Sequence, residues 1–133
     1  FDAARAFVEH GARVLMDVSD GLLLDALRIA RASGARLVVE LARVPVHRDA
    51  RRLSLLDGMP PLEHALRDGE DHELLGCLSR AGAARLVASG SAKKLGLARI
   101  GMVVAGAGVA LARHDGSLEF PAGAGGWIHG APS

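Results

Sequence analysis

Two acidic segments hold the residues whose types and spacing suggest chemistry. The first is Asp17-Val18-Ser19-Asp20-Gly21, which follows a short apolar run and precedes an amphipathic stretch. Open α/β sheets tend to bind ligands at such strand-to-helix junctions, where the free N–H groups of the helix start favour phosphate. Two carboxylates repel a bare phosphate, whereas Mg2+ accepts one or two carboxylates together with phosphate oxygens. The segment therefore suits a metal–polyphosphate site.

An ordinary helix start is the alternative interpretation of this segment. Ser19 or Asp20 would then be the N-cap of the following helix, and an acid in the first turn would interact favourably with the helix dipole. Considered alone, the segment favours this alternative, because capped helix starts are so common.

The second acidic segment precedes an apolar run of strand type. It contains Asp68, Glu70, Asp71 and Glu73, and so many neighbouring carboxylates are costly unless a cation or a hydrogen-bond donor faces them. The alternative is a solvated turn. An EF-hand is excluded, because the glycine and the closing glutamate do not stand at the required positions.

Trp127 is the single tryptophan in a chain of which 3% is aromatic, and it lies in a glycine-rich stretch. It either fills the core near the C-terminus or provides a platform on which a flat heterocycle stacks. The surrounding glycines cannot build a local core. We therefore expect the Trp127 side chain to be partly exposed in this chain.

Composition excludes several classes of protein. The formal net charge of +1 over 133 residues gives no reason to expect binding to nucleic acid or to a membrane surface. The lone cysteine, Cys77, rules out an internal disulfide framework and fits a cytoplasmic location. The longest stretch without an ionisable residue, residues 100–112, is too short for a membrane-spanning helix. No signal peptide is visible.

The hydrophobic pattern alternates along the chain between the spacing of an amphipathic helix and the short apolar runs of strands. Helical spacing predicts helices over 2–10 and 83–95 and another that opens at 19–21 and closes at 33–34. Between 45 and 67 it predicts two short helices, or one helix and a lid-like loop. Short apolar runs predict strands at 14–16, 37–41, 73–79 and 118–120, and one long or bent strand over 99–113, interrupted at 106–108. This alternation indicates an α/β sandwich around a single mixed sheet.

Taken together, the motifs resemble the C-terminal domain of thiamine-monophosphate kinases, a branch of the aminoimidazole-ribonucleotide synthetase superfamily. The resemblance covers about residues 13–129. The motifs that carry it occur in the order of the family: residues 16–22 with Asp25, 32–34, 69–71 with 73–75, 100–109, and 126–127 with His129.

The resemblance implies a three-layer α/β/α sandwich, partly ferredoxin-like, and an ATP- and Mg2+-dependent enzyme that phosphorylates thiamine monophosphate to thiamine diphosphate. It implies that Asp17 and Asp20 are Mg2+ ligands and that Ser19 contacts an ATP phosphate. It also implies that Glu70 and Trp127 contact the thiamine substrate. No covalent nucleophile is required for such a transfer.

We expect the chain to be one C-terminal domain, residues 1–133, of a longer two-domain protein. The N-terminal domain would supply the remaining nucleotide and metal contacts and the homodimer interface, so we expect this chain alone to be inactive. The chain departs from the family pattern at several positions, where glycine, tyrosine, phenylalanine and an aromatic residue are usual: Asp68, His72, Gly76 and Gly130. The alternatives are therefore a non-catalytic ligand-binding or interaction module, or a sister enzyme that acts on another phosphorylated small molecule.

Overall fold

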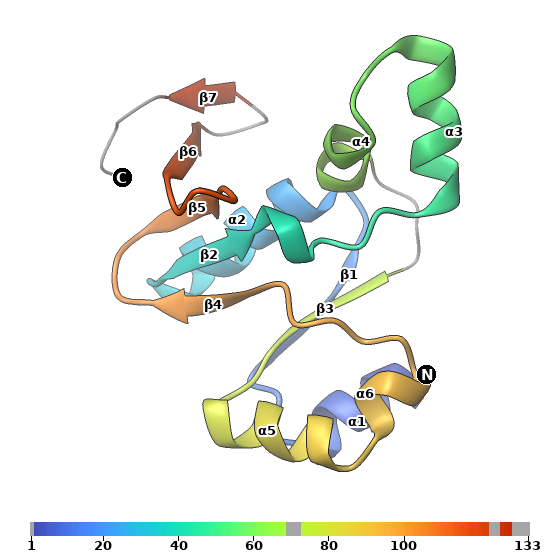
Figure 1. Ribbon diagram of the computed structural model, residues 1–133. Helices are drawn as coiled ribbons and strands as arrows, with labels where there is room; N and C mark the ends of the chain where they lie inside the picture. The colour runs from blue at the N-terminus through green and yellow to red at the C-terminus, as the bar shows by residue number, and fades with distance from the viewer. Residues whose placement is uncertain (1, 69–72, 123–125, 129–133) are drawn as a thin grey trace.

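Helices and strands alternate along the chain in the computed structural model, which describes residues 2–68, 73–122 and 126–128 (Figure 1). The helices are α1 (Asp2–Glu9), α2 (Leu22–Ser33), α3 (Arg48–Asp57), α4 (Pro61–Arg67), α5 (Arg80–Ala88) and α6 (Ser91–Lys94), with a 3-10 turn η1 (Leu41–Arg43). The strands are β1 (Val14–Val18), β2 (Arg36–Glu40), β3 (Glu73–Cys77), β4 (Gly101–Val104), β5 (Gly108–Ala112), β6 (Leu118–Ala122) and β7 (Gly126–Ile128).

The strands form two sheets. One is an antiparallel ribbon of β1 and β3, and the other has the order β4-β2-β5-β6-β7, with β2 and β5 parallel and the remaining pairs antiparallel. The predicted α/β class with a mixed sheet is confirmed. The strands form two sheets, however, whereas the hydrophobic pattern predicts a single sheet.

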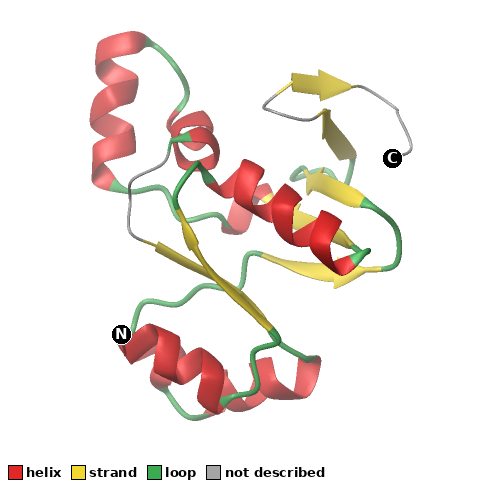
Figure 2. Cartoon of the chain, turned by 180° about the vertical axis from the view of Figure 1, so that it is seen from behind, coloured by secondary structure: helices red, strands yellow, loops and turns green. Residues whose placement is uncertain are grey.

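The β1–β3 ribbon separates two groups of helices. α2 and α4 lie on one side of it together with the larger sheet, and α1, α5 and α6 lie on the other (Figure 2). Successive residues of a strand point to opposite faces. Accordingly, Met16 and Val18 pack in the cluster around α2, whereas Leu15 packs with Phe7 of α1 and Leu86 of α5. The ribbon is therefore covered on both faces, although most of its residues are only half-buried.

The larger core forms where α2 covers the five-stranded sheet. The apolar residues of α2 recur at helical spacing and pack against β2 and β5; the buried set comprises Leu23, Ala26, Leu27, Ala30, Leu37, Val39, Val109 and Leu111. Burying one leucine side chain contributes about 1.5–3 kcal/mol. This packing fixes α2, and with it the loop that leads into α2 from β1.

Two expectations about single elements are wrong in detail. The expected helix over 83–95 is two helices, because the chain turns at Gly90, whose φ is +80°. The expected long strand over 99–113 is two strands, which lie on opposite sides of β2. In both cases a local break in the pattern marks a complete change of direction.

Candidate functional site

The end of β1 and the loop that leads to α2 present three of the predicted site residues to solvent. Asp17 lies near the end of β1, and Ser19 and Asp20 follow before α2 begins at Leu22; all three are exposed. The sheet and helix that flank the loop are anchored in the core. Asp17 on β1 and Ser19 and Asp20 on the loop are therefore all accessible at one strand-to-helix junction.

The buried carboxylate of Asp25 fixes the backbone of this loop by hydrogen bonds. Its side chain is 0% exposed, and its Oδ2 accepts hydrogen bonds from the backbone N–H of Ser19 (2.8 Å) and of Asp20 (3.1 Å). Asp25 lies in the first turn of α2, where the helix dipole also favours a negative charge. Buried polar groups are stable only when they are hydrogen-bonded, so these two bonds tie the shape of the loop to the helix.

Arg28 connects Asp25 to Asp20. Its Nη1 lies 2.8 Å from Oδ1 of Asp25 and 2.5 Å from Oδ2 of Asp20. These two carboxylates raise the pKa of Arg28, with the hydrogen bond to Asp20 as the largest cause. One guanidinium thus bridges two acids of the junction and offsets part of their charge.

The alternative in which Ser19 or Asp20 is the N-cap is wrong. The N-cap of α2 is Gly21, with φ +102° and ψ +146°, and no side chain caps the helix there. A Cβ at position 21 would lie 2.6 Å from the carbonyl oxygen of Arg67. The loop therefore needs a glycine for its backbone conformation and also for its contact with the end of α4.

This contact brings the two acidic segments of the sequence together. Arg67 ends α4 and Asp68 follows it directly, so the second segment starts beside the β1–α2 loop. Glu70, the predicted substrate contact in that segment, lies outside the described residues. Trp127 lies on β7, opposite Pro121 of β6, but its side chain is outside the described part, so the expected exposure stays a prediction.

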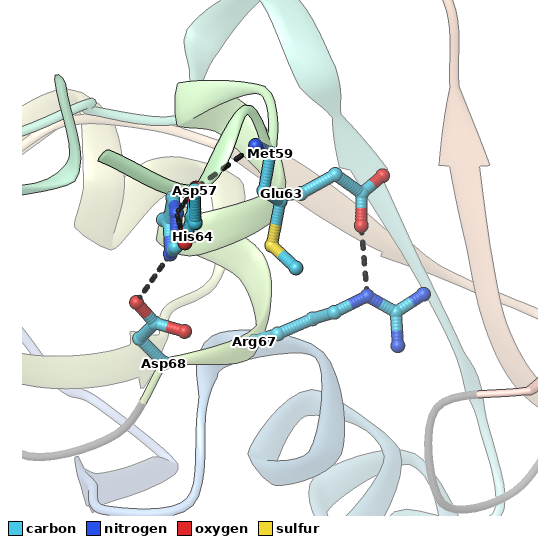
Figure 3. A network of polar contacts seen from close by, with 6 residues as sticks. All are labelled: Asp57, Met59, Glu63, His64, Arg67 and Asp68. Atoms are coloured by element: carbon cyan, nitrogen blue, oxygen red, sulfur yellow. Dashed lines mark hydrogen bonds and ion pairs between the residues drawn. The ribbon is translucent and has the colours of Figure 1, made fainter. Parts of the chain in front are cut away.

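A polar network around His64 ties α3 to α4 (Figure 3). The buried His64 ring donates from Nδ1 to Oδ2 of Asp68 (2.7 Å) and from Nε2 to Oδ2 of Asp57 (3.0 Å). Donation from both nitrogens requires the imidazolium form, and the pKa of His64 is raised, chiefly by the hydrogen bond to Asp68. The Met59 N–H is the main cause of the lowered pKa of Asp57.

Asp68, where the family usually has a glycine, is therefore the partner of a buried histidine. A second ion pair, between His47 and Glu73, lies nearby. Both pairs border a pocket of about 50 Å³, whose lining includes Pro45, Leu53 and Ala65. That volume is small beside the 300–1,000 Å³ of common ligand sites.

Sequence patterns alone did not single out Asp25, Arg28 and His64 as contributors to the site. One signal was present for two of them: on a helix, positions 25 and 28 are neighbours on one face, which makes an acid and an arginine at that spacing a natural ion pair. A comparable signal exists for one partner of His64, because Asp68 follows it at the i+4 position. Helical spacing does not mark its other partner, Asp57, which lies on α3.

The carboxylates present fit Mg2+ by donor type. Among the described residues, no group of three or more His, Cys, Asp and Glu side chains is placed to hold a metal ion. Mg2+ commonly takes only one or two protein carboxylates and completes its shell with water and phosphate oxygens. Asp17 at the end of β1 and Asp20 on the following loop, both exposed, supply two such carboxylates.

Solved structures define the class of domain. The chain superposes on E. coli HypE, a hydrogenase maturation protein, with a TM-score of 0.71 at 23% identity, over 96% of this chain and 39% of that one. At such identity the likeness concerns the fold alone. A thiamine-monophosphate kinase from Stenotrophomonas maltophilia superposes with a TM-score of 0.63 at 33% identity, over 80% of this chain and 32% of that one. The chain thus has the α/β fold that these kinases share with HypE.

Sequence relatives point to the kinase branch. Thiamine-monophosphate kinase of Methanopyrus kandleri is 37% identical over 74% of this chain and 29% of its own length. The enzyme of that name from Caulobacter vibrioides is 35% identical over 90% of this chain and 34% of its own length. The predicted resemblance to thiamine-monophosphate kinases is confirmed, and the chain spans about a third of the length of these relatives. No family model matches the chain.

One more solved relative was bound to two small molecules. AaThiL, in complex with AMPPCP and TMP, superposes with a TM-score of 0.61 at 29% identity, over 84% of this chain and 33% of that one.

Within the described part of this chain, every helix is too short or too polar to cross a membrane.

Proposed function

We propose that this chain forms the part of a thiamine-monophosphate kinase that brings the β1–α2 loop to the phosphates. The whole protein transfers the γ-phosphoryl group of ATP to thiamine monophosphate and yields thiamine diphosphate. The observation that supports this most directly is the junction itself: Asp17 at the end of β1 and Ser19 and Asp20 on the following loop are all exposed, and the buried Asp25 accepts hydrogen bonds from the backbone of Ser19 and Asp20. The relatives named above carry this activity in their names.

Each side chain of the loop has a role that follows from its chemistry. Asp17 and Asp20 would hold Mg2+, which when bound neutralises charge that builds up between the phosphates of the two substrates. The Ser19 hydroxyl would donate a hydrogen bond to an ATP phosphate oxygen. Gly21 would let the phosphates approach the start of α2, where the helix dipole favours negative charge.

Phosphoryl transfer of this kind depends on positioning and electrostatics, because no covalent intermediate with the protein is required. Asp25 and the packed α2 keep the loop in one shape, so little reorganisation is needed when the substrates arrive. Glu70 and Trp127 would contact the thiamine substrate, with the indole face stacked against a cationic ring. The whole protein would be a cytoplasmic homodimer whose remaining length supplies further metal and nucleotide contacts.

Removing single carboxylates from the loop tests this function. In the whole protein, Asp17→Asn and Asp20→Asn should each lower kcat about 100-fold, the effect of losing one preorganised electrostatic contact. Their free energy of unfolding should change by at most about 1 kcal/mol, because both side chains are exposed. Glu9→Gln, on the distant α1, is the matched control and should leave kcat unchanged. Normal activity in the folded Asp20→Asn protein would overturn the proposal.

A further inference from the structure

Arg28 pairs with the Asp20 carboxylate at the exposed end of the β1–α2 loop. The guanidinium contacts both Asp20 and Asp25 through a single nitrogen, Nη1. An arginine carries five N–H donors in a planar fork. Other N–H groups of the Arg28 guanidinium are therefore available to donate to a ligand beside the β1–α2 loop.

The two contacts of Arg28 differ in how easily they can be exchanged. The Asp20 and Arg28 side chains are 51% and 49% exposed, and ion pairs with such exposure are weak, since water and salt compete with them. Asp25 is fully buried, and it is fixed by the N–H groups of Ser19 and Asp20 as well. Opening the Asp20 contact is therefore cheap, whereas opening the Asp25 contact would strand a buried charge.

We propose that Arg28 is a phosphate-binding residue that exchanges partners. In the protein without ligands it holds Asp20, and when a metal-bound polyphosphate arrives it moves from Asp20 to a phosphate oxygen while it remains tethered to Asp25. This inference rests on the proposed function, because the exchange requires Asp20 to accept the metal.

The exchange solves an electrostatic problem at this loop. Without a ligand, Asp17, Asp20 and Asp25 would place three carboxylates on one short segment, and Arg28 neutralises part of that charge. Asp20, when it holds a metal ion, would no longer need Arg28 for charge balance, and the guanidinium would be free to move. The released guanidinium then meets the phosphate oxygens, for which its planar fork is well suited. Arg28 thus lowers affinity for a bare metal ion and raises affinity for the metal–polyphosphate complex.

Two ligands measured on one variant separate these opposite effects. The probes are Mn2+ alone and Mn2+ with inorganic tripolyphosphate, and the readout is the paramagnetic broadening of the Ser19 and Asp20 amide signals in NMR spectra of the 133-residue chain. For Arg28→Gln we expect up to about five-fold tighter binding of Mn2+ alone, the range of an exposed ion pair. We expect about ten-fold weaker binding of Mn2+–tripolyphosphate, the loss of a charged hydrogen bond. Arg31→Gln, on the exposed surface of the same helix, should change neither.

Folding is controlled with a second variant. Arg28→Gln leaves the Asp25 charge buried, so the double variant Asp25→Asn/Arg28→Gln removes both charges together and should show the same two opposite shifts. A purely structural role would weaken both ligands in parallel, and that result overturns the proposal.

The outcomes also distinguish this proposal from the proposed function. Asp20→Asn should abolish Mn2+ broadening. If it does, but Arg28→Gln binds both probes as the unaltered chain does, the metal assignment stands and only the exchange is wrong. If neither the unaltered chain nor Arg28→Gln shows broadening, or if Asp20→Asn retains it, both the metal assignment and the exchange are wrong.

Discussion

Gly21 and Arg67 meet backbone to backbone, and this contact joins the two acidic segments of the chain. A Cβ at position 21 would lie 2.6 Å from the Arg67 carbonyl oxygen and 2.9 Å from its carbonyl carbon. A side chain at position 21 would push the end of α4 away from the start of α2. The glycine of the Asp-x-Ser-Asp-Gly motif therefore sets the distance between the start of α2 and the end of α4.

Gly21→Ala should destabilise the fold by about 3 kcal/mol, because it adds both backbone strain at φ +102° and a clash with Arg67. Urea denaturation measures this loss. Gly34→Ala, at the other end of α2, is the matched control: its φ is +62°, but nothing lies within 4 Å of the added Cβ. It should cost only about 1 kcal/mol. Equal losses in the two variants would show that the Arg67 contact has no effect.

His64 should make the stability of the chain depend on pH near neutrality. Since Asp68 and Asp57 raise its pKa, the protonated ring stabilises the folded state fully below the ordinary value of 6.5. That contribution is lost as the pH rises through the higher pKa of the folded state. The pKa of Asp57 is lowered, so its contribution is present above the ordinary value of 3.8 and is lost as the pH falls through the lower folded-state pKa.

The free energy of unfolding, measured by urea denaturation at a series of pH values, should therefore decline as the pH is raised above 6.5. His64→Gln should remove most of this decline, because glutamine does not titrate. His114→Gln, in an exposed turn, is the control and should retain it. An unchanged pH profile in His64→Gln would show that the ring is neutral in the folded chain.

Gly76 and Phe7 should be coupled energetically. The family usually has phenylalanine at position 76, but here a Cβ at that position would lie 2.8 Å from the Phe7 ring of α1. Gly76→Ala should thus cost about 2 kcal/mol through overpacking. Phe7→Leu should relieve part of this cost, so the double variant should lose less stability than the sum of the two single losses. Strict additivity in this double-mutant cycle would contradict the contact.

Trp127→Ala should raise the KM for thiamine monophosphate about five-fold in the whole protein and leave the KM for ATP nearly unchanged, because a cation over an indole face contributes about 0.5–2 kcal/mol. Steady-state kinetics with each substrate varied in turn gives both constants. Phe120→Leu, on the neighbouring β6, is the control: Phe120 stacks with Arg36 at 5.1 Å and should affect neither constant. A loss of stability in Trp127→Ala with normal KM values would place the indole in the core.

The type of most elements could be predicted from the sequence, since it depends on patterns within one segment. The spacing of Leu23, Leu27 and Ala30 predicts α2, and the run before Asp17 predicts β1; both are present. The site loop was predicted in the same way, because the motif at Asp17–Gly21 lies within a few residues. Local periodicity reports which face of a segment is apolar, and that is enough to define a helix or a strand.

Which distant segments of the chain contact one another depends on tertiary structure alone. Strands β4 and β5 are close in sequence, yet they flank β2, which precedes both by many residues. His64 of α4 pairs with Asp57 of α3, and this contact depends on how the two helices pack. The Gly21–Arg67 contact likewise depends on how α2 and α4 pack. Pairing and packing between distant segments depend on the burial of the whole chain, which no single segment records.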